Sequence, residues 1–147
     1  NGNKPFNVNI QPYMETLSEC NNYLNFCDVY IEPSGAEGFS WPGMVALCLD
    51  KHIVAHDCTG IKEWANSDNA VLFAPEGKVS ALDGIFFHAN TGFNSGNIFE
   101  WSEDSFLNAL ETVHKKWENN KTNKEEGKKA REKFTRSKFV DSILSII

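Results

Sequence analysis

The sequence predicts an α/β fold, and three observations support this. Short apolar runs typical of buried strands alternate with helix-like runs between residues 4 and 75. Strands and helices at such short intervals indicate a parallel sheet, because parallel neighbours need a crossover between them. The length of 147 residues, with 41% hydrophobic residues, suits one folded unit. We therefore expect a single domain over 1–147, built as a Rossmann-like parallel sheet with helices on both faces.

The first expected elements are a strand within 4–14 and a helix within 13–27. The strand is predicted because Phe6, Val8 and Ile10 alternate with polar residues. The helix is predicted because apolar residues recur at spacings of three and four, which places them on one face. These residues are Met14, Leu17, Cys20, Leu24 and Cys27.

Five more elements follow in alternation. Residues 28–33 read as a buried strand ended by Pro33, and residues 41–50 read as an apolar helix with Pro42 in its first turn. The remaining elements are a strand over 52–56, a short helix within 58–66 that opens near Thr59 or Gly60, and a strand over 70–75.

The C-terminal part, 102–147, is expected to be helical, whereas residues 88–97 read as a Gly/Asn-rich loop bordering a site. A helix over 102–119 is expected to begin after an N-cap at Ser102. Its apolar face is Phe106, Leu107, Leu110, Val113 and Trp117. Thr122 and Glu125 have the spacing of a capping box for a last helical region. Core candidates there are Ala130, Phe134, Phe139, Val140, Ile143, Leu144 and Ile147.

The charge distribution argues against nucleic acid as a partner, because the net charge is −6. Ten of the fourteen Lys and Arg lie within 114–138 against four acids, so this segment carries +6 and the remainder −12. The segment reads either as a solvated helix face or as a surface for weak contact with an anionic membrane or a partner. No apolar run approaches the roughly 18 residues that cross a bilayer.

Cysteine and histidine usage indicates a reducing, cytoplasmic location, peripheral to a membrane if the basic segment acts there, and no metal site. The four cysteines form no C-x-x-C pair and read as buried free thiols. No His pair has metal-ligand spacing. His56, beside Asp57 after a predicted strand, serves either a ligand or the cap of the next turn. Trp41 and Trp64 either stack on a ligand or pack in the fold.

The glycine-rich turn 35–40 is the main candidate site. It joins the strand over 28–33 to the helix over 41–50, and ligands of parallel α/β sheets bind outside the carboxyl ends of the strands. The opening of a helix offers unpaired N–H groups that suit a phosphate. A phosphate would repel Glu37, so this carboxylate is expected to bind ligand hydroxyls or, alternatively, to cap the helix.

Three stretches in order, "CDVYIEPSGAEGFSWPGMVAL", "IVAHDCTGIKEWA" and "NAVLFAP", resemble the C-terminal, donor-binding domain of retaining glycosyltransferases with the GT-B fold, the glycosyl transferase group 1 type. The resemblance is close over residues 24–75. It implies transfer of a hexose from a nucleoside diphosphate sugar, the donor substrate, to a glycan, lipid or protein acceptor, without a further cofactor.

The resemblance also implies roles for individual residues. Pro33 and Ser34 match the strand exit, and Glu37 matches the acid that contacts the donor's sugar hydroxyls, here taken as the catalytic residue. The loop whose amides face the sugar and diphosphate corresponds to Gly38, Phe39 and Ser40, and the later turn to Thr59, Gly60 and Glu63. Val45 stands where the family has the acid that holds the ribose, and valine cannot accept a ribose hydroxyl.

The family's basic pair for the diphosphate and its acceptor domain would both precede Asn1. We therefore expect an N-terminally incomplete unit that transfers no sugar alone, with an uncovered sheet edge that favours homo-oligomers. A non-catalytic binding or assembly module derived from the GT-B fold is the alternative. A different nucleotide-binding Rossmann domain has less support, because G-x-G-x-x-G and G-x-x-x-x-G-K-[ST] are absent.

Overall fold

The centre of the protein is a three-stranded parallel sheet in the order β1-β2-β3. We describe it from a computed structural model, which describes residues 7–82, 84–85, 87–89 and 96–145. The strands are β1 (Val29–Glu32), β2 (His52–His56) and β3 (Val71–Phe73). Every residue of β2 is buried, as expected for the middle strand. The three strands predicted over 28–33, 52–56 and 70–75 are confirmed, and the fold is α/β.

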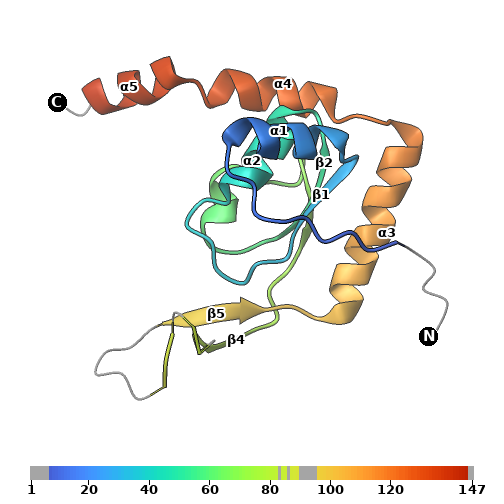
Figure 1. Ribbon diagram of the computed structural model, residues 1–147, viewed down its shortest axis with the longest axis vertical. Coiled ribbons are helices and arrows are strands. Elements are labelled where there is room, and N and C mark those ends of the chain that lie inside the picture. The colour runs from blue at the N-terminus through green and yellow to red at the C-terminus, as the bar shows by residue number, and fades with distance from the viewer. Residues whose placement is uncertain (1–6, 83, 86, 90–95, 146–147) are drawn as a thin grey trace.

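Helices cover both faces of this sheet (Figure 1). One face carries α2 (Trp41–Cys48), which packs against α1 (Leu17–Phe26) and α4 (Lys124–Lys133). The other face carries α3 (Glu103–Asn119), which contacts β2 and β3. Successive residues of β2 point to opposite faces, so Ile53 joins the core beneath α2 while Val54 packs with α3.

The N-terminal predictions are only partly correct. The expected helix is α1, in which Thr16 and Glu19 form a capping box. Its expected apolar face is mostly not buried: Leu24 is buried, but Leu17 is 75% exposed. The strand predicted within 4–14 is wrong for residues 7–14, which form no strand, and Phe6 lies outside the described residues. Alternating residues cannot hold a strand without a partner for its hydrogen bonds.

A two-stranded antiparallel sheet, which we did not predict, follows β3. It consists of β4 (Gly77–Ser80) and β5 (Asn97–Glu100), with Lys78 opposite Phe99. The predicted loop over 88–97 leads into β5, and its residues 90–95 lie outside the described part of the chain. The Phe99 amide donates to the Gly35 carbonyl at 2.9 Å, and a Cβ at Gly35 would overlap the Phe99 carbonyl. The small sheet therefore packs on the loop that follows β1.

Helix α3 begins as predicted, with the Ser102 hydroxyl accepting a hydrogen bond from the Ser105 amide. Its expected face is partly wrong, because Leu107 is exposed whereas Ala109 is buried beside Val113. Ala109 belongs to the core cluster on this face of the sheet, together with Phe73 of β3.

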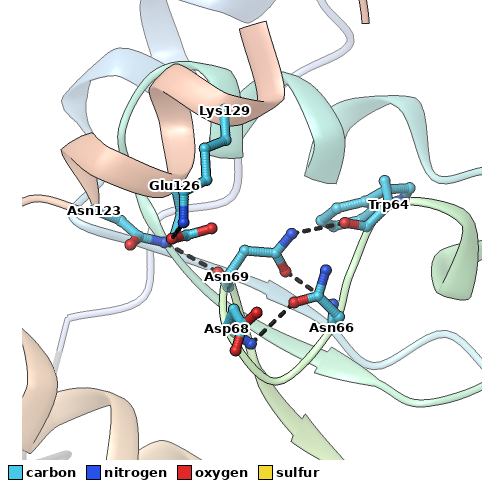
Figure 2. A network of polar contacts seen from close by, with 7 residues as sticks. All are labelled: Trp64, Asn66, Asp68, Asn69, Asn123, Glu126 and Lys129. Atoms are coloured by element: carbon cyan, nitrogen blue, oxygen red, sulfur yellow. Dashed lines mark hydrogen bonds and ion pairs between the residues drawn. The ribbon is translucent and has the colours of Figure 1, made fainter. Parts of the chain in front are cut away.

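The capping box predicted for α4 is not formed. Contacts of its N-cap residue instead attach the helix to the rest of the domain. The N-cap residue is Asn123, not Thr122, and its side chain does not cap the helix. Instead its amide group donates to the Asn69 carbonyl at 3.0 Å, as Figure 2 shows. Asn69 in turn donates to the Trp64 carbonyl at 2.7 Å and accepts from the Asn66 amide at 2.8 Å.

The same helix packs on the turn between α2 and β2. Gly127 lies so close to Asp50 that a Cβ would overlap its carboxylate, and Arg131 forms an ion pair with Asp50 at 2.6 Å. Ala130 is buried and Phe134 packs beside it, as predicted. The Arg131 guanidinium also donates to the Cys48 carbonyl. At least Arg131 of the basic segment therefore pairs with groups of the protein itself.

Helix α5 (Arg136–Leu144) continues from α4 and extends beyond the sheet (Figure 1). Val140 and Leu144 are 43% and 62% exposed, so their prediction as core residues is wrong. The side chains of Phe139 and Ile143, and Ile147 altogether, lie outside the described part. Across the described ranges, no helix combines the length and apolar character needed to span a membrane.

Candidate functional site at the carboxyl ends of β1 and β2

The loops that follow β1 and β2 meet at one edge of the sheet. The Gly60 amide donates to the Glu37 carbonyl at 2.9 Å, and the Glu37 amide donates to the Thr59 hydroxyl at 2.9 Å. These loops meet because β1 and β2 are parallel neighbours, whose carboxyl ends lie at the same edge. Four residues proposed for the site, Glu37, Gly38, Thr59 and Gly60, are thus brought together.

Glycine is required at position 60 by packing. A Cβ there would overlap the carbonyl group of Gly38 and would also crowd the Glu37 carbonyl oxygen. Its neighbour Thr59, the first residue of the 3₁₀ helix η1 (Thr59–Glu63), has φ +46°, which is rare for a β-branched residue. The hydrogen bond from the Glu37 amide to the Thr59 hydroxyl helps to hold this strained backbone.

Ser40 is the N-cap residue of α2, but its hydroxyl does not cap the helix. Its backbone is left-handed, with φ +57° and ψ 69°, a conformation that favours glycine. The hydroxyl points instead to the Glu32 carboxylate, to which it donates at 2.5 Å. Both side chains are buried. A glycine would adopt this backbone without strain.

Glu32 is the residue of this region that sequence reasoning missed. It ends β1, is only 8% exposed, and accepts hydrogen bonds from the Tyr30 hydroxyl at 3.1 Å and the Ser34 amide at 3.4 Å. Burial, followed by the negative charge of Glu32, raises the pKa of Tyr30 well above its ordinary value. Its hydroxyl therefore keeps its proton and remains a donor. An acid inside an otherwise apolar strand run was the available signal.

The Glu37 side chain is half-buried and does not cap α2, since the N-cap position belongs to Ser40. In the part of the chain that the structure describes, the Glu37 carboxylate takes part in no hydrogen bond or ion pair. Its negative charge is the smallest of the contributions that raise the pKa of Tyr30. Gly38 beside it is exposed, and a Cβ added there would meet no other atom within 4 Å. Both residues are free to contact a ligand.

Three other residues proposed for the site, Ser34, Phe39 and Val45, make contacts within the protein. The Ser34 hydroxyl donates to the Ala36 carbonyl at 3.1 Å, and the Phe39 carbonyl accepts from the buried Trp64 indole at 2.5 Å. The Phe39 ring packs against the core beneath α2, and Val45 does so from α2. Trp64 is thus a core residue, whereas Trp41 is 60% exposed.

His56 does not cap the following turn, because Cys58 holds the N-cap position of η1 and makes no side-chain cap. The His56 ring is fully buried and stacked on Phe73, with centroids 5.1 Å apart. Its Nδ1 lies 3.1 Å from the Ser34 carbonyl and 3.4 Å from the Cys58 sulfur. Burial lowers the pKa of His56 and raises that of the Cys58 thiol. Both groups are therefore neutral near pH 7.

Two hollows of the protein lie away from this turn. One of about 260 Å³ is at the amino ends of β2 and β3, lined by residues that include His52 and Val113. Another of about 520 Å³ lies between residues 11–15 and α1. No residue of the glycine turn lines either of them. The candidate site is thus a turn at the protein surface that carries the Glu37 carboxylate, and it belongs to neither hollow.

In the described ranges, no group of three or more His, Cys, Asp or Glu is placed so that it could hold a metal ion. The cysteines at 20, 27, 48 and 58 are all free thiols, of which Cys58 alone is buried.

Comparison with protein-family models, curated proteins and solved structures finds no match for this chain.

Proposed function

We propose that this chain is the donor-binding part of a retaining glycosyltransferase, which transfers a hexose from a nucleoside diphosphate sugar to an acceptor. The observation that carries the proposal is the contact between the two loops. Glu37 and Gly38 rest on Gly60 at the carboxyl edge of the sheet, while the Glu37 carboxylate is left without a described protein partner. Ligands of parallel α/β sheets bind at this edge.

The chemistry of the turn fits hydroxyl recognition. The Glu37 carboxylate can accept hydrogen bonds from two sugar hydroxyls, and bonds to a charged acceptor are stronger than neutral ones. Gly38 allows the ligand to approach the backbone closely, since it has no side chain and faces open space. In this reaction class the protein acts mainly by positioning the donor and stabilising the departing diphosphate. We assign the positioning of the donor to this chain.

A non-catalytic module built on the same fold is the second candidate. Val45 favours it, because this residue packs against the core where the resemblance implies a ribose-binding acid. An apolar side chain there removes one hydrogen-bond acceptor for a nucleotide. Such a domain would present its surface to another protein instead of a donor.

Titration of the ¹⁵N-labelled chain with UDP-, GDP- and ADP-glucose separates the two candidates. The proposal expects one of them to cause saturable shifts of the Gly38 and Gly60 amides. Glu37→Gln should weaken that binding, whereas Glu103→Gln, an equal charge change in the exposed first turn of α3, should not. A chain that binds none of the three nucleotide sugars would reject the proposal and leave the non-catalytic module.

A further inference from the structure

The hollow at the amino ends of β2 and β3 lies at the edge of the sheet opposite the glycine turn. Its volume is about 260 Å³. Sites for drug-sized ligands measure roughly 300–1,000 Å³, so this one suits a smaller molecule. Its apolar lining residues are Ile53, Ala70, Val71 and Val113, and the others are polar. The hollow therefore offers both an apolar surface and hydrogen-bonding groups.

His52 lines the hollow and has one ring nitrogen that no described residue uses. The residue is only 6% exposed. Its Nε2 lies 2.7 Å from the Asn120 carbonyl, which can only accept, so Nε2 carries a hydrogen and donates it. Its Nδ1 has no described hydrogen-bond partner and is not among the fully enclosed polar atoms that lack one. This nitrogen is therefore available to a ligand.

The C-terminal end of α3 supplies free hydrogen-bond donors. Lys116 lines the hollow, and the described ion pairs do not include it. Asn120 lines it too, and its side-chain oxygen accepts from the Thr122 amide at 3.4 Å. The NH₂ group of Asn120 is left without a described partner. Because an ammonium and an amide NH₂ only donate, these two groups suit a carboxylate.

The turn before β3 and the start of α4 supply free acceptors. Asp68 lines the hollow, and its carboxylate takes part in no described hydrogen bond or ion pair. The Asn123 NH₂ group donates to the Asn69 carbonyl, which leaves the Asn123 side-chain oxygen as an acceptor (Figure 2). Asn69 is itself held by hydrogen bonds to Trp64 and Asn66. These acceptors therefore belong to a fixed framework, and they suit an ammonium group.

Asp68 and Lys116 line one hollow with opposite charges but do not form one of the described ion pairs with each other. A molecule that carries both an ammonium and a carboxylate group can bridge them. A neutral molecule would leave both charges unused, and a singly charged one would leave one unused. The full charges of these side chains exceed the roughly half-unit charge at a helix end, so they set the orientation of the ligand.

We infer that this hollow binds a free α-amino acid with a small apolar side chain. Its ammonium group lies at Asp68 and Asn123, and its carboxylate lies at Lys116 and Asn120. The apolar side chain contacts the apolar lining, and His52 adds a ring nitrogen beside it. The inference goes beyond the proposed function and is independent of it, because no residue of the glycine turn lines this hollow.

The test compares L-valine with two probes that each lack one of its charged groups. The ¹⁵N-labelled chain is titrated at neutral pH and matched ionic strength with L-valine, isobutylamine and isovalerate, following the Ala70 and Val71 amides. We expect saturable shifts with L-valine. Either probe should bind at least about tenfold more weakly, because it loses a charged group and the hydrogen bonds of that group. D-glucose, a neutral molecule, should cause no saturable shift.

Two variants assign the charges. Asp68→Asn should weaken L-valine binding by about fivefold, the upper worth of an exposed ion pair, without weakening isovalerate, which has no ammonium group. Lys116→Gln should weaken L-valine similarly without weakening isobutylamine. Lys115→Gln is the matched control, because this neighbouring residue does not line the hollow, and it should leave L-valine binding unchanged.

Three outcomes overturn the inference. The first is the absence of saturable shifts with L-valine up to its solubility limit. The second is binding of D-glucose or of a single-charge probe as tight as that of L-valine, which would assign the hollow to another class of ligand. The third is unchanged L-valine binding in both folded variants. The wild-type comparison decides the question even if a variant does not fold. The nucleotide-sugar titration that tests the proposed function is unaffected by any of these results.

Discussion

Gly60 and Gly38 lie in contact across two loops, so close that a Cβ on Gly60 would overlap the Gly38 carbonyl group. The two residues are far apart in sequence, and their contact exists because β1 and β2 are adjacent and parallel. This contact fixes where the Glu37 backbone lies.

Gly60→Ala should destabilise the protein by about 1–3 kcal/mol, because the added methyl group meets backbone that cannot move aside easily. Gly38→Ala is the matched control. Its Cβ would face open space, so the free energy of unfolding should change by no more than about 0.5 kcal/mol. Urea unfolding measures both. Equal effects of the two variants would contradict the described contact.

Ser40→Ala should cost about 1–3 kcal/mol, since it leaves the buried Glu32 carboxylate without its shortest hydrogen bond. Ser40→Gly loses the same bond but relieves the left-handed backbone at φ +57°, which is worth about 1–2 kcal/mol. The glycine variant should therefore be the more stable of the two by roughly that amount. Denaturant unfolding of the pair checks this, and an alanine variant at least as stable as the glycine variant would argue against strain at Ser40.

Glu37→Ala should change the free energy of unfolding by less than about 0.5 kcal/mol, because its carboxylate has no described protein partner. Binding of the nucleotide sugar should weaken by about 1.5–3 kcal/mol, roughly 10- to 150-fold, the worth of a charged hydrogen bond. Calorimetric titration and unfolding of the same preparation measure the two effects. Loss of stability with binding retained would assign Glu37 a structural role.

Val45→Glu should tighten nucleotide binding by up to about tenfold if the rest of a ribose pocket is intact. The acid replaces a half-buried side chain that packs against the core, so the protein should lose about 0.5–3 kcal/mol of stability. Val45→Gln, similar in size but uncharged, is the control. A folded glutamate variant with no gain over glutamine would favour the non-catalytic module.

The stability of the protein should fall as the pH drops below about 6.5, through His56. Burial lowers the pKa of His56 in the folded state, so between that value and the unfolded value of about 6.5 the unfolded chain binds more protons. This stabilisation is fully present above the pKa that His56 has in the unfolded chain. It is lost as the pH falls towards the pKa of His56 in the folded protein, by at most about 1.4 kcal/mol per pH unit. Unfolding at pH 5 to 8 should show this slope in the wild type and a reduced slope in His56→Phe.

The sequence by itself determined the alternation of elements. Residues 52–56 are apolar at their centre and are followed by a turn, a pattern typical of a buried strand. Ser102 marked the start of α3 because an N-cap hydroxyl acts on the next few residues. The glycine turn was found the same way, from a strand that ends and a helix that begins nearby.

Only the tertiary structure decided which of these local patterns gained partners. Val8 and Ile10 alternate like strand residues, but no strand in the described ranges pairs with them, and Leu17 has helical spacing but faces solvent. Glu32 stood out only as an acid in an apolar strand run, and it became part of the site because folding buried it against Ser40, eight residues away. Local periodicity and capping act over a few residues and can be read from the chain. Burial, the Gly60–Gly38 contact and the charge beside α2 depend on which segments meet, and that is settled only when the sheet assembles.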